Sequence, residues 1–196
     1  MKYIFLISGW CGSGKDMVAD YLVSNTKFKY KFCKLNIANE LKKYTAKKYN
    51  FDYNLTNTQS GKQTLCYLKE NNQNITKSVR DLLIEEALLQ KTKFGDDFFI
   101  QKVSNKIDEI DEIDETYLSK TCILISDFRF IHEYEFMKNK YHDKIKTIRI
   151  NRFNVAPINS PSETELDNFK FDYTIINNGK KEDVYKQIDE IFFNIL

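Results

Sequence analysis

The start of the chain constrains the fold most, because an apolar run leads directly into a glycine-rich loop that ends in lysine. Residues 2–8 are almost entirely apolar, which predicts a central parallel strand buried on both faces. The next residues, GWCGSGKD, fit G-x-x-x-x-G-K through Gly9, Gly14 and Lys15. Glycines let the N–H groups of such a loop turn toward phosphate oxygens. The sequence therefore predicts a phosphate-binding loop followed by a helix that begins at about Ser13.

Asp16 departs from this motif, which normally has Ser or Thr at that position to reach Mg²⁺. A carboxylate beside a triphosphate is favourable only if magnesium lies between them, directly or through water. The alternatives are that Asp16 caps the helix, or that the loop is a glycine-rich turn with a chance lysine. We expect ATP to be bound by Gly9, Cys11, Gly12, Ser13, Gly14, Lys15, Asp16 and Met17.

The rest of the chain alternates between predicted strands and helices. Strands are expected at residues 28–35, 121–126, 146–150 and 171–179, the last ending in a turn. Helices are expected at 38–48, from Ser78 as N-cap, from Asp96 or Asp97, near 132–140, and from about 184 to 195. The run DEIDEIDE at 108–115 is expected to be a solvated helix end. This alternation predicts a three-layer α/β fold with a parallel sheet of about five strands.

Residues 49–76 show no clear periodicity and predict an irregular surface excursion, either an ordered substrate lobe or a loose insertion. The chain of 196 residues is expected to form a single domain. Within it we expect a substrate-binding excursion at about 36–118 and a lid at about 151–168.

Composition excludes several classes of function. The 30 basic and 28 acidic residues give a net charge of +2, which provides no general attraction to nucleic acid or membranes. Four scattered cysteines indicate free thiols in a reducing cytosol rather than a zinc site. Only four of the basic residues are arginine: Arg80, Arg129, Arg149 and Arg152. We expect these at positions that need a planar, bidentate cation, although a structural ion pair is the alternative for each.

A second polar cluster follows the strand predicted at 121–126. Ligands of parallel sheets bind at the carboxyl ends of the strands, so Asp127 and Arg129 are expected on the same side as the loop. Asp127 suits a magnesium-binding role, Arg129 a bidentate phosphoryl clamp, and Glu133 a contact to a nucleoside. The alternative is an ordinary helix start capped by Asp127, with an Arg129–Glu133 pair.

Together these segments resemble the deoxynucleoside monophosphate kinases of bacteriophages and large DNA viruses. That family has G-x-x-x-S-G-K-D after its first strand, matched here with Asp16 in place. Its A-x-x-L-K helix is matched by Ala38, Leu41 and Lys42, and its D-x-R-F-x-x-E segment by Asp127, Arg129, Phe130 and Glu133. Its late S-E-x-x-L-D segment is matched at 162–167, and its last strand at 171–179. The resemblance extends over nearly the whole chain.

The resemblance implies roles for individual residues. It assigns catalysis to Lys15, Asp127 and Arg129, and magnesium to Asp16 and Asp127. It assigns substrate binding to Lys42, Lys62, Arg80, Phe99, Asp127, Arg129, Glu133 and Ser162, with Phe99 stacking near the base. Arg149 and Arg152 would belong to the lid that closes over the phosphates.

The chain departs from the family at three places. A Gly-Thr pair after the substrate arginine is replaced by EALL at 86–89, the family's His before Ser-Glu is Ser160, and its tryptophan is Phe99. These departures affect base selection more than phosphoryl transfer.

The resemblance predicts ATP- and Mg²⁺-dependent phosphorylation of a deoxynucleoside monophosphate in the cytoplasm, the host cytoplasm if the chain is viral. A homodimer is allowed, and neither nucleic acid nor membrane is expected as a partner. Two alternatives stay open. Animal-type phosphomevalonate kinases also carry a G-K-D loop, and a nucleotide-binding switch or slow ATPase would share the loop. A guanine-reading N-K-x-D motif is absent from the sequence.

Overall fold

The computed structural model describes residues 3–70, 73–117, 120–157 and 160–196. Residue 2 of the first predicted strand and residues 158–159 of the predicted lid therefore lie outside the described residues. The chain forms two compact units. One consists of Met1–Asn36 and Val103–Leu196, and the other of Ile37–Lys102.

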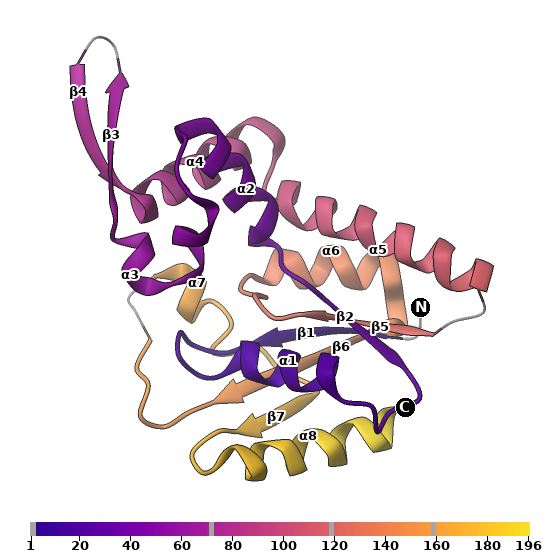
Figure 1. Ribbon diagram of the computed structural model, residues 1–196. Coiled ribbons are helices and arrows are strands. Elements are labelled where there is room, and N and C mark those ends of the chain that lie inside the picture. The colour runs from indigo at the N-terminus through magenta and orange to yellow at the C-terminus, as the bar shows by residue number, and fades with distance from the viewer. Residues whose placement is uncertain (1–2, 71–72, 118–119, 158–159) are drawn as a thin grey trace. The chain divides into compact units, whose positions relative to one another are not determined.

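The first unit contains a five-stranded parallel sheet in the order β2-β5-β1-β6-β7 (Figure 1). The strands are β1 (Ile4–Ser8), β2 (Lys31–Leu35), β5 (Thr121–Ile125), β6 (Ile145–Asn151) and β7 (Tyr173–Ile176). Every residue of β1 and β5 is buried, as expected for the centre of a doubly covered parallel sheet. The predicted fold class and number of strands are confirmed.

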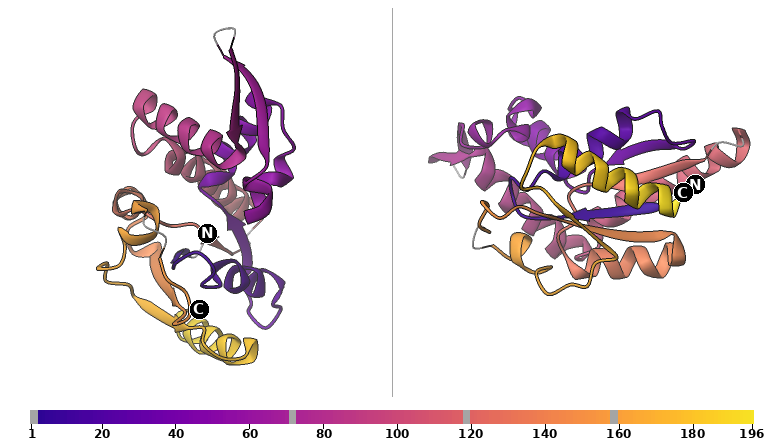
Figure 2. Two further views of the ribbon diagram at one scale, coloured as in Figure 1. Left: turned by 90° about the vertical axis from the view of Figure 1, so that its left-hand side faces the viewer. Right: turned by 90° about the horizontal axis from the view of Figure 1, so that it is seen from below.

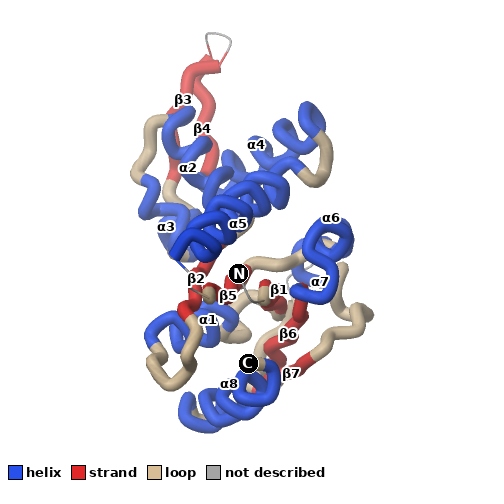
Figure 3. The backbone as a smooth tube through the Cα atoms, turned by 90° about the vertical axis from the view of Figure 1, so that its right-hand side faces the viewer, coloured by secondary structure: helices blue, strands red, loops and turns tan. Residues whose placement is uncertain are grey.

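Helices cover both faces of this sheet (Figures 1 and 3). On one face lie α1 (Lys15–Ser24) and α8 (Lys181–Ile195), which pack against each other, while α8 also packs against β7 (Figure 2). On the other face lie α6 (Ile131–Tyr141) and the part of α5 (Phe98–Tyr117) that belongs to this unit. Phe5 and Ile7 form a core with Val18, Leu22 and Phe192 on the α1–α8 face. Because side chains alternate along a strand, Ile4 and Leu6, which are equally buried, face the opposite side of the sheet.

The second unit contains α2 (Ala38–Tyr49), the short helices η1 (Tyr53–Asn57) and α3 (Gln59–Lys62), a β-hairpin and α4 (Val79–Phe94). The hairpin strands β3 (Leu65–Glu70) and β4 (Gln73–Ser78) pair in antiparallel register, Leu65 opposite Ser78, and extend away from α2 and α4 (Figure 1). The prediction of an irregular segment at 49–76 is therefore wrong. The hairpin lacks the alternation of apolar residues that a half-buried strand shows, and Tyr67 is 82% exposed.

The acidic run at 108–115 is also more structured than expected. Asp108, Asp111 and Asp114 follow one another at three-residue spacing, which keeps them near one face of α5. Asp108 accepts a hydrogen bond from the Tyr141 hydroxyl at 2.8 Å, and Asp111 pairs with Lys144. Asp114 is 4% exposed and accepts hydrogen bonds from the backbone N–H and the hydroxyl of Thr121. These carboxylates thus connect α5 to the sheet and to α6 rather than ending in solvent.

Shorter elements complete the chain. The 3₁₀ turn η2 (His142–Lys144) follows α6, and α7 (Pro161–Thr164) lies in the long connection between β6 and β7. Within the ranges given above, no helix combines the length and the apolar character needed to cross a membrane.

Candidate active site

The loop between β1 and α1 has the conformation that its glycines predict. Gly14 immediately precedes α1 with a φ of 103°, and a Cβ there would lie 2.5 Å from the side-chain nitrogen of Asn177. That Asn177 nitrogen donates to the carbonyl of Ser13 at 2.8 Å. A Cβ on Gly9 would lie 2.5 Å from the carbonyl oxygen of Ile150 in β6. Both glycines are therefore required by close approach of neighbouring segments.

Lys15 points back at its own loop. Its Nζ donates to the carbonyl of Gly9 at 2.6 Å and to that of Trp10 at 2.9 Å. Burial, followed by the charge of Arg129, lowers the pKa of Lys15, while the charge of Glu163 acts in the opposite direction. The ammonium group thus lies inside the loop and is held by neutral acceptors that a phosphate can replace.

Asp16, the unusual residue of the motif, is held by two neighbours. Lys34 Nζ lies 2.8 Å from Asp16 Oδ1, and the Ser126 hydroxyl donates to the same oxygen at 3.0 Å. Burial by itself would raise the pKa of Asp16, but the hydrogen bond and charge of Lys34, the hydrogen bond of Ser126 and the charge of Lys15 lower it overall. The side chain is nevertheless 70% exposed. Asp16 is therefore an ionised, accessible carboxylate at the start of α1.

Lys34 and Ser126 are site residues that the sequence reasoning missed. Lys34 lies near the carboxyl end of β2, and Ser126 directly follows β5. Ligands bind at the carboxyl ends of parallel strands, so the positions themselves were the available signal.

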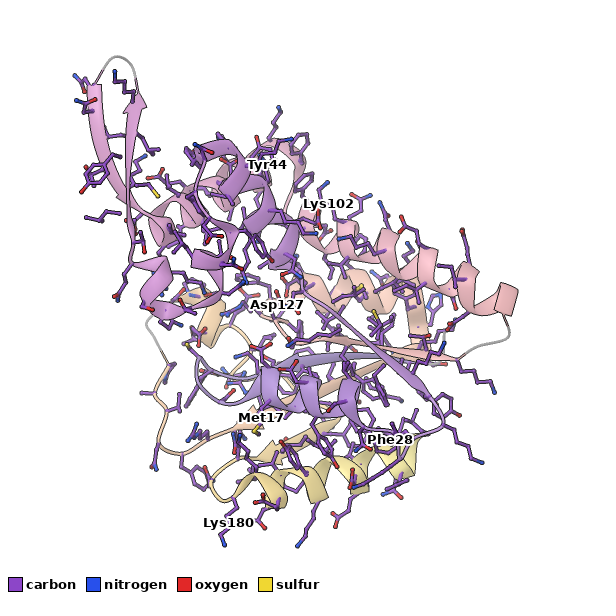
Figure 4. The ribbon with its side chains drawn as sticks, viewed as in Figure 1. Met17, Phe28, Tyr44, Lys102, Asp127 and Lys180 are labelled. Atoms are coloured by element: carbon purple, nitrogen blue, oxygen red, sulfur yellow. The ribbon has the colours of Figure 1, made fainter. Side chains whose placement is uncertain are left out.

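Three of the predicted site residues, Asp127, Arg129 and Glu133, follow β5 in the sequence. Asp127 lies just beyond the end of β5 (Figure 4), and Arg129 Nη1 donates to Glu163 Oε1 at 2.6 Å and to the carbonyl of Ser162 at 3.1 Å. Glu133 is buried and accepts hydrogen bonds from the backbone N–H groups of Arg129 and Phe130. Glu133 therefore caps the start of α6, in keeping with the structural alternative raised for this segment, although the residue at the N-cap position is Phe130.

The segment 160–167 is bound to the loop through its carboxylates. Glu163 Oε2 accepts from the backbone N–H of Cys11 at 2.5 Å. Asp167 Oδ1 accepts from the indole N–H of Trp10 at 2.9 Å and from Arg149 Nη2 at 2.6 Å. The sequence predicted Ser162 as a site residue in this segment but not Glu163. The available signal was that Glu163 belongs to the same S-E-x-x-L-D match as Ser162.

The two arginines assigned to the lid lie in different surroundings. Arg149 is a buried residue of β6, and its guanidinium lies over the rings of Trp10 and Phe171. Among the described residues of the predicted lid it pairs with Asp167, and the structure places Arg149 itself in the sheet and not in the lid. Arg152 is exposed and donates to the carbonyl of Gly12 at 3.2 Å. Arg152 thus lies at the mouth of the loop.

The other predicted substrate residues belong to the second unit. Arg80, near the start of α4, donates to Gln59 Oε1, and Gln59 shares the short helix α3 with Lys62. Lys42 lies in α2. Phe99 is buried and lines a cavity of about 330 Å³ together with Leu41, Tyr44, Phe94, Phe98, Glu40, Gln90, Lys93 and Lys102. Tyr44 and Lys102, labelled in Figure 4, mark the walls of this cavity.

A nucleotide phosphate fits the residues of the loop. Among the described residues, Ser13 Oγ is buried without a hydrogen-bond partner, and the Cys11 N–H is directed at a carboxylate, which is an anion. A metal would depend on the nucleotide for most of its ligands, because the described residues contain no group of three or more His, Cys, Asp or Glu side chains able to hold one. Asp16, accessible and ionised, suits such a shared magnesium site.

Comparison with known proteins gives no independent family assignment: neither a family model nor a curated protein matches the chain.

Proposed function

We propose that this chain is a kinase that transfers the γ-phosphoryl group of ATP to a deoxynucleoside monophosphate. One observation carries the proposal: a G-x-x-x-x-G-K-D loop that ends in Asp16, directly after a buried central strand, shares one edge of the sheet with Asp127 and Arg129. Phosphoryl transfer needs little more than positioned cations and N–H donors, which this edge provides. The resemblance to viral deoxynucleoside monophosphate kinases supports the choice of acceptor.

Lys15 and Arg129 supply the mobile cations of the proposed reaction. Lys15 exchanges its two carbonyl partners for the β- and γ-phosphates, and the loop N–H groups hold the β-phosphate. Arg129 exchanges its bond to Glu163 for the transferring phosphoryl group, which its planar guanidinium can bind through two donors. Arg152 extends the cationic lining at the mouth of the loop.

Magnesium, when bound, neutralises charge on the phosphates, and Asp16 and Asp127 are the residues that would hold it. The acceptor monophosphate is assigned to Arg80, with Lys42 and Lys62, and its base to the neighbourhood of Phe99. Ser162 and Glu133 remain assigned to substrate binding by resemblance only. We place this reaction in the cytoplasm, where ATP and deoxynucleotides are available.

The proposal is tested by an ADP-release assay with ATP and Mg²⁺ against a panel of acceptors. The panel contains dTMP, dGMP, dCMP and dAMP, their ribose counterparts and phosphomevalonate. We expect ADP release that depends on at least one deoxynucleotide and is lost in Lys15→Ala, but retained in Lys186→Ala, a control at an exposed lysine of α8. Release that depends only on phosphomevalonate, or slow release independent of every acceptor, would reject the proposal in favour of another kinase or a nucleotide switch.

Arg129→Lys tests the role of the guanidinium. Lysine keeps the charge but donates from a single nitrogen, so we expect kcat to fall by about a hundredfold, the scale seen when one transition-state donor is removed. The melting temperature should change little, because Arg129 remains partly exposed. A lowered melting temperature with unchanged kcat would instead make Arg129 a structural partner of Glu163.

A further inference from the structure

The carboxylate of Glu163 occupies a place in the loop where an anion is expected. Its Oε2 accepts from the backbone N–H of Cys11 at 2.5 Å, and its Oε1 accepts from Arg129 at 2.6 Å. The side chain is only 6% exposed. A carboxylate removed from water in this way needs both charge and hydrogen bonds from its surroundings, which Arg129 and the loop N–H of Cys11 supply.

The partners of Glu163 are the groups that a nucleotide phosphate would use. Backbone N–H groups in a loop of this type converge on phosphate oxygens, and Cys11 lies in the middle of the loop. Arg129 is the proposed phosphoryl clamp, and Lys15 is close enough for the charge of Glu163 to oppose the lowering of the Lys15 pKa by burial and Arg129. One carboxylate thus engages the N–H donor and the arginine at once, and faces the loop lysine.

The rest of the segment is secured independently of Glu163. Glu165 accepts from the backbone N–H of Ile131 at 2.8 Å, and Asp167 accepts from Trp10 and Arg149. Leu166 is 2% exposed and anchors the segment in the core. Glu163 can therefore leave the loop through a local change in α7, while the bonds at 165 and 167 hold the segment nearby.

We propose that Glu163 is an internal competitor of the nucleotide phosphate, holding the Cys11 N–H and Arg129 until ATP binds and then releasing both to it. The inference rests on the proposed function, since it needs a nucleotide in this loop. Like charges repel, so the carboxylate and a phosphate cannot share these donors. Release of Arg129 is then coupled to occupation of the loop, which makes Glu163 a positioning residue for the clamp.

Glu163→Gln is the test. Glutamine keeps the shape and can still accept from the Cys11 N–H, but it lacks the charge that competes with phosphate. We expect the variant to bind MgADP and inorganic tripolyphosphate about tenfold more tightly than the wild type in calorimetric titrations, the scale of one charge-assisted hydrogen bond. Glu165→Gln, two residues along and bonded to Ile131, is the matched control and should bind as the wild type does.

Trp10 provides a second readout, because it is the sole tryptophan and directly precedes Cys11, whose N–H Glu163 holds. We expect MgADP to change its fluorescence in the wild type, and the change to be smaller in Glu163→Gln, where the uncharged side chain holds the Cys11 N–H less tightly before the nucleotide binds. Glu163→Asp, which keeps the charge but shortens the side chain, guards against misfolding of the glutamine variant and should bind with intermediate affinity.

The outcomes separate the two proposals. Equal or weaker nucleotide binding by both Glu163 variants, with clear binding by the wild type, would overturn the competitor role and leave the kinase proposal standing. Failure of every protein, wild type included, to bind MgADP or tripolyphosphate would reject the nucleotide site itself, and the competitor role with it.

Discussion

At the scale of single residues, the conformation and charge of the phosphate-binding loop depend on a few contacts with individual side chains. Gly14 leaves room for Asn177, Lys15 donates to two carbonyls of the loop, and Glu163 takes the Cys11 N–H. Asp16 pairs with Lys34, which comes from β2. The charge environment of the loop is thus set by residues that are distant in sequence.

Gly14→Ala should destabilise the protein and weaken nucleotide binding. The alanine must adopt a φ of 103°, and its Cβ must displace Asn177 from its bond to Ser13. We expect a loss of about 2 kcal/mol in the free energy of unfolding, measured by urea denaturation. Gly95→Ala is the control: its φ is 93°, but nothing lies within 4 Å of the new Cβ, so it carries the backbone strain alone. Equal losses in the two variants would show that contact with Asn177 is unimportant.

Lys34→Met should raise the pKa of Asp16. In the wild type the pKa lies below its ordinary 3.8, so the carboxylate contributes stability above about that pH and loses it as the pH falls through the lowered value. Without Lys34, only the hydrogen bond of Ser126 and the charge of Lys15 still oppose burial, so the pKa should rise and the stability that depends on this ionisation should shrink. A ¹³C NMR titration of the carboxyl group measures the change. Lys31→Met, an exposed position in the same strand, should leave the titration unaltered.

At the scale of elements, local signals decided most boundaries. Ser78 is the predicted N-cap of α4: its hydroxyl accepts from the N–H of Asp81, whose carboxylate accepts from the Ser78 N–H in return. The hairpin β3–β4 was missed because β4 is polar at most positions and the apolar residues of β3 do not alternate with polar ones. Amphipathic helices and buried strands thus reveal themselves through apolar spacing, and exposed hairpins do not.

Ser78→Ala removes this cap. We expect α4, and with it the free energy of unfolding, to lose about 1 kcal/mol, measured from the shift in the urea midpoint at constant m-value. Ser78→Asn restores an acceptor at the same position and should recover most of the loss. If asparagine were as destabilising as alanine, the capping hydrogen bond would not be what stabilises this end of α4.

At the scale of the whole molecule, the loop-bearing unit is built from two separate parts of the chain, Met1–Asn36 and Val103–Leu196. The loop comes from the first part, and Arg129, Arg152 and Glu163 come from the second. Any ligand held by both parts must stabilise their association, because it binds the folded unit and not the unfolded chain.

ADP with Mg²⁺ should therefore raise the melting temperature. A ligand at a hundred times its Kd adds about 2.7 kcal/mol to the folded state, which corresponds to about 5–10 °C for a chain of this size. Differential scanning calorimetry measures the shift. Lys15→Ala should abolish it, and Lys186→Ala should preserve it. An unchanged melting temperature in saturating MgADP would argue against a nucleotide site in the loop.

The sequence by itself determined the class of fold and the position of the loop. Buried parallel strands must be continuously apolar, and a phosphate loop needs glycine and lysine at fixed spacing, so both are visible locally. The tertiary structure alone decided that Lys34 and Ser126 hold Asp16, that Arg149 lies in the sheet, and that Glu163 enters the loop. These contacts join residues far apart in the chain, where the distance in sequence carries no information about the distance in space.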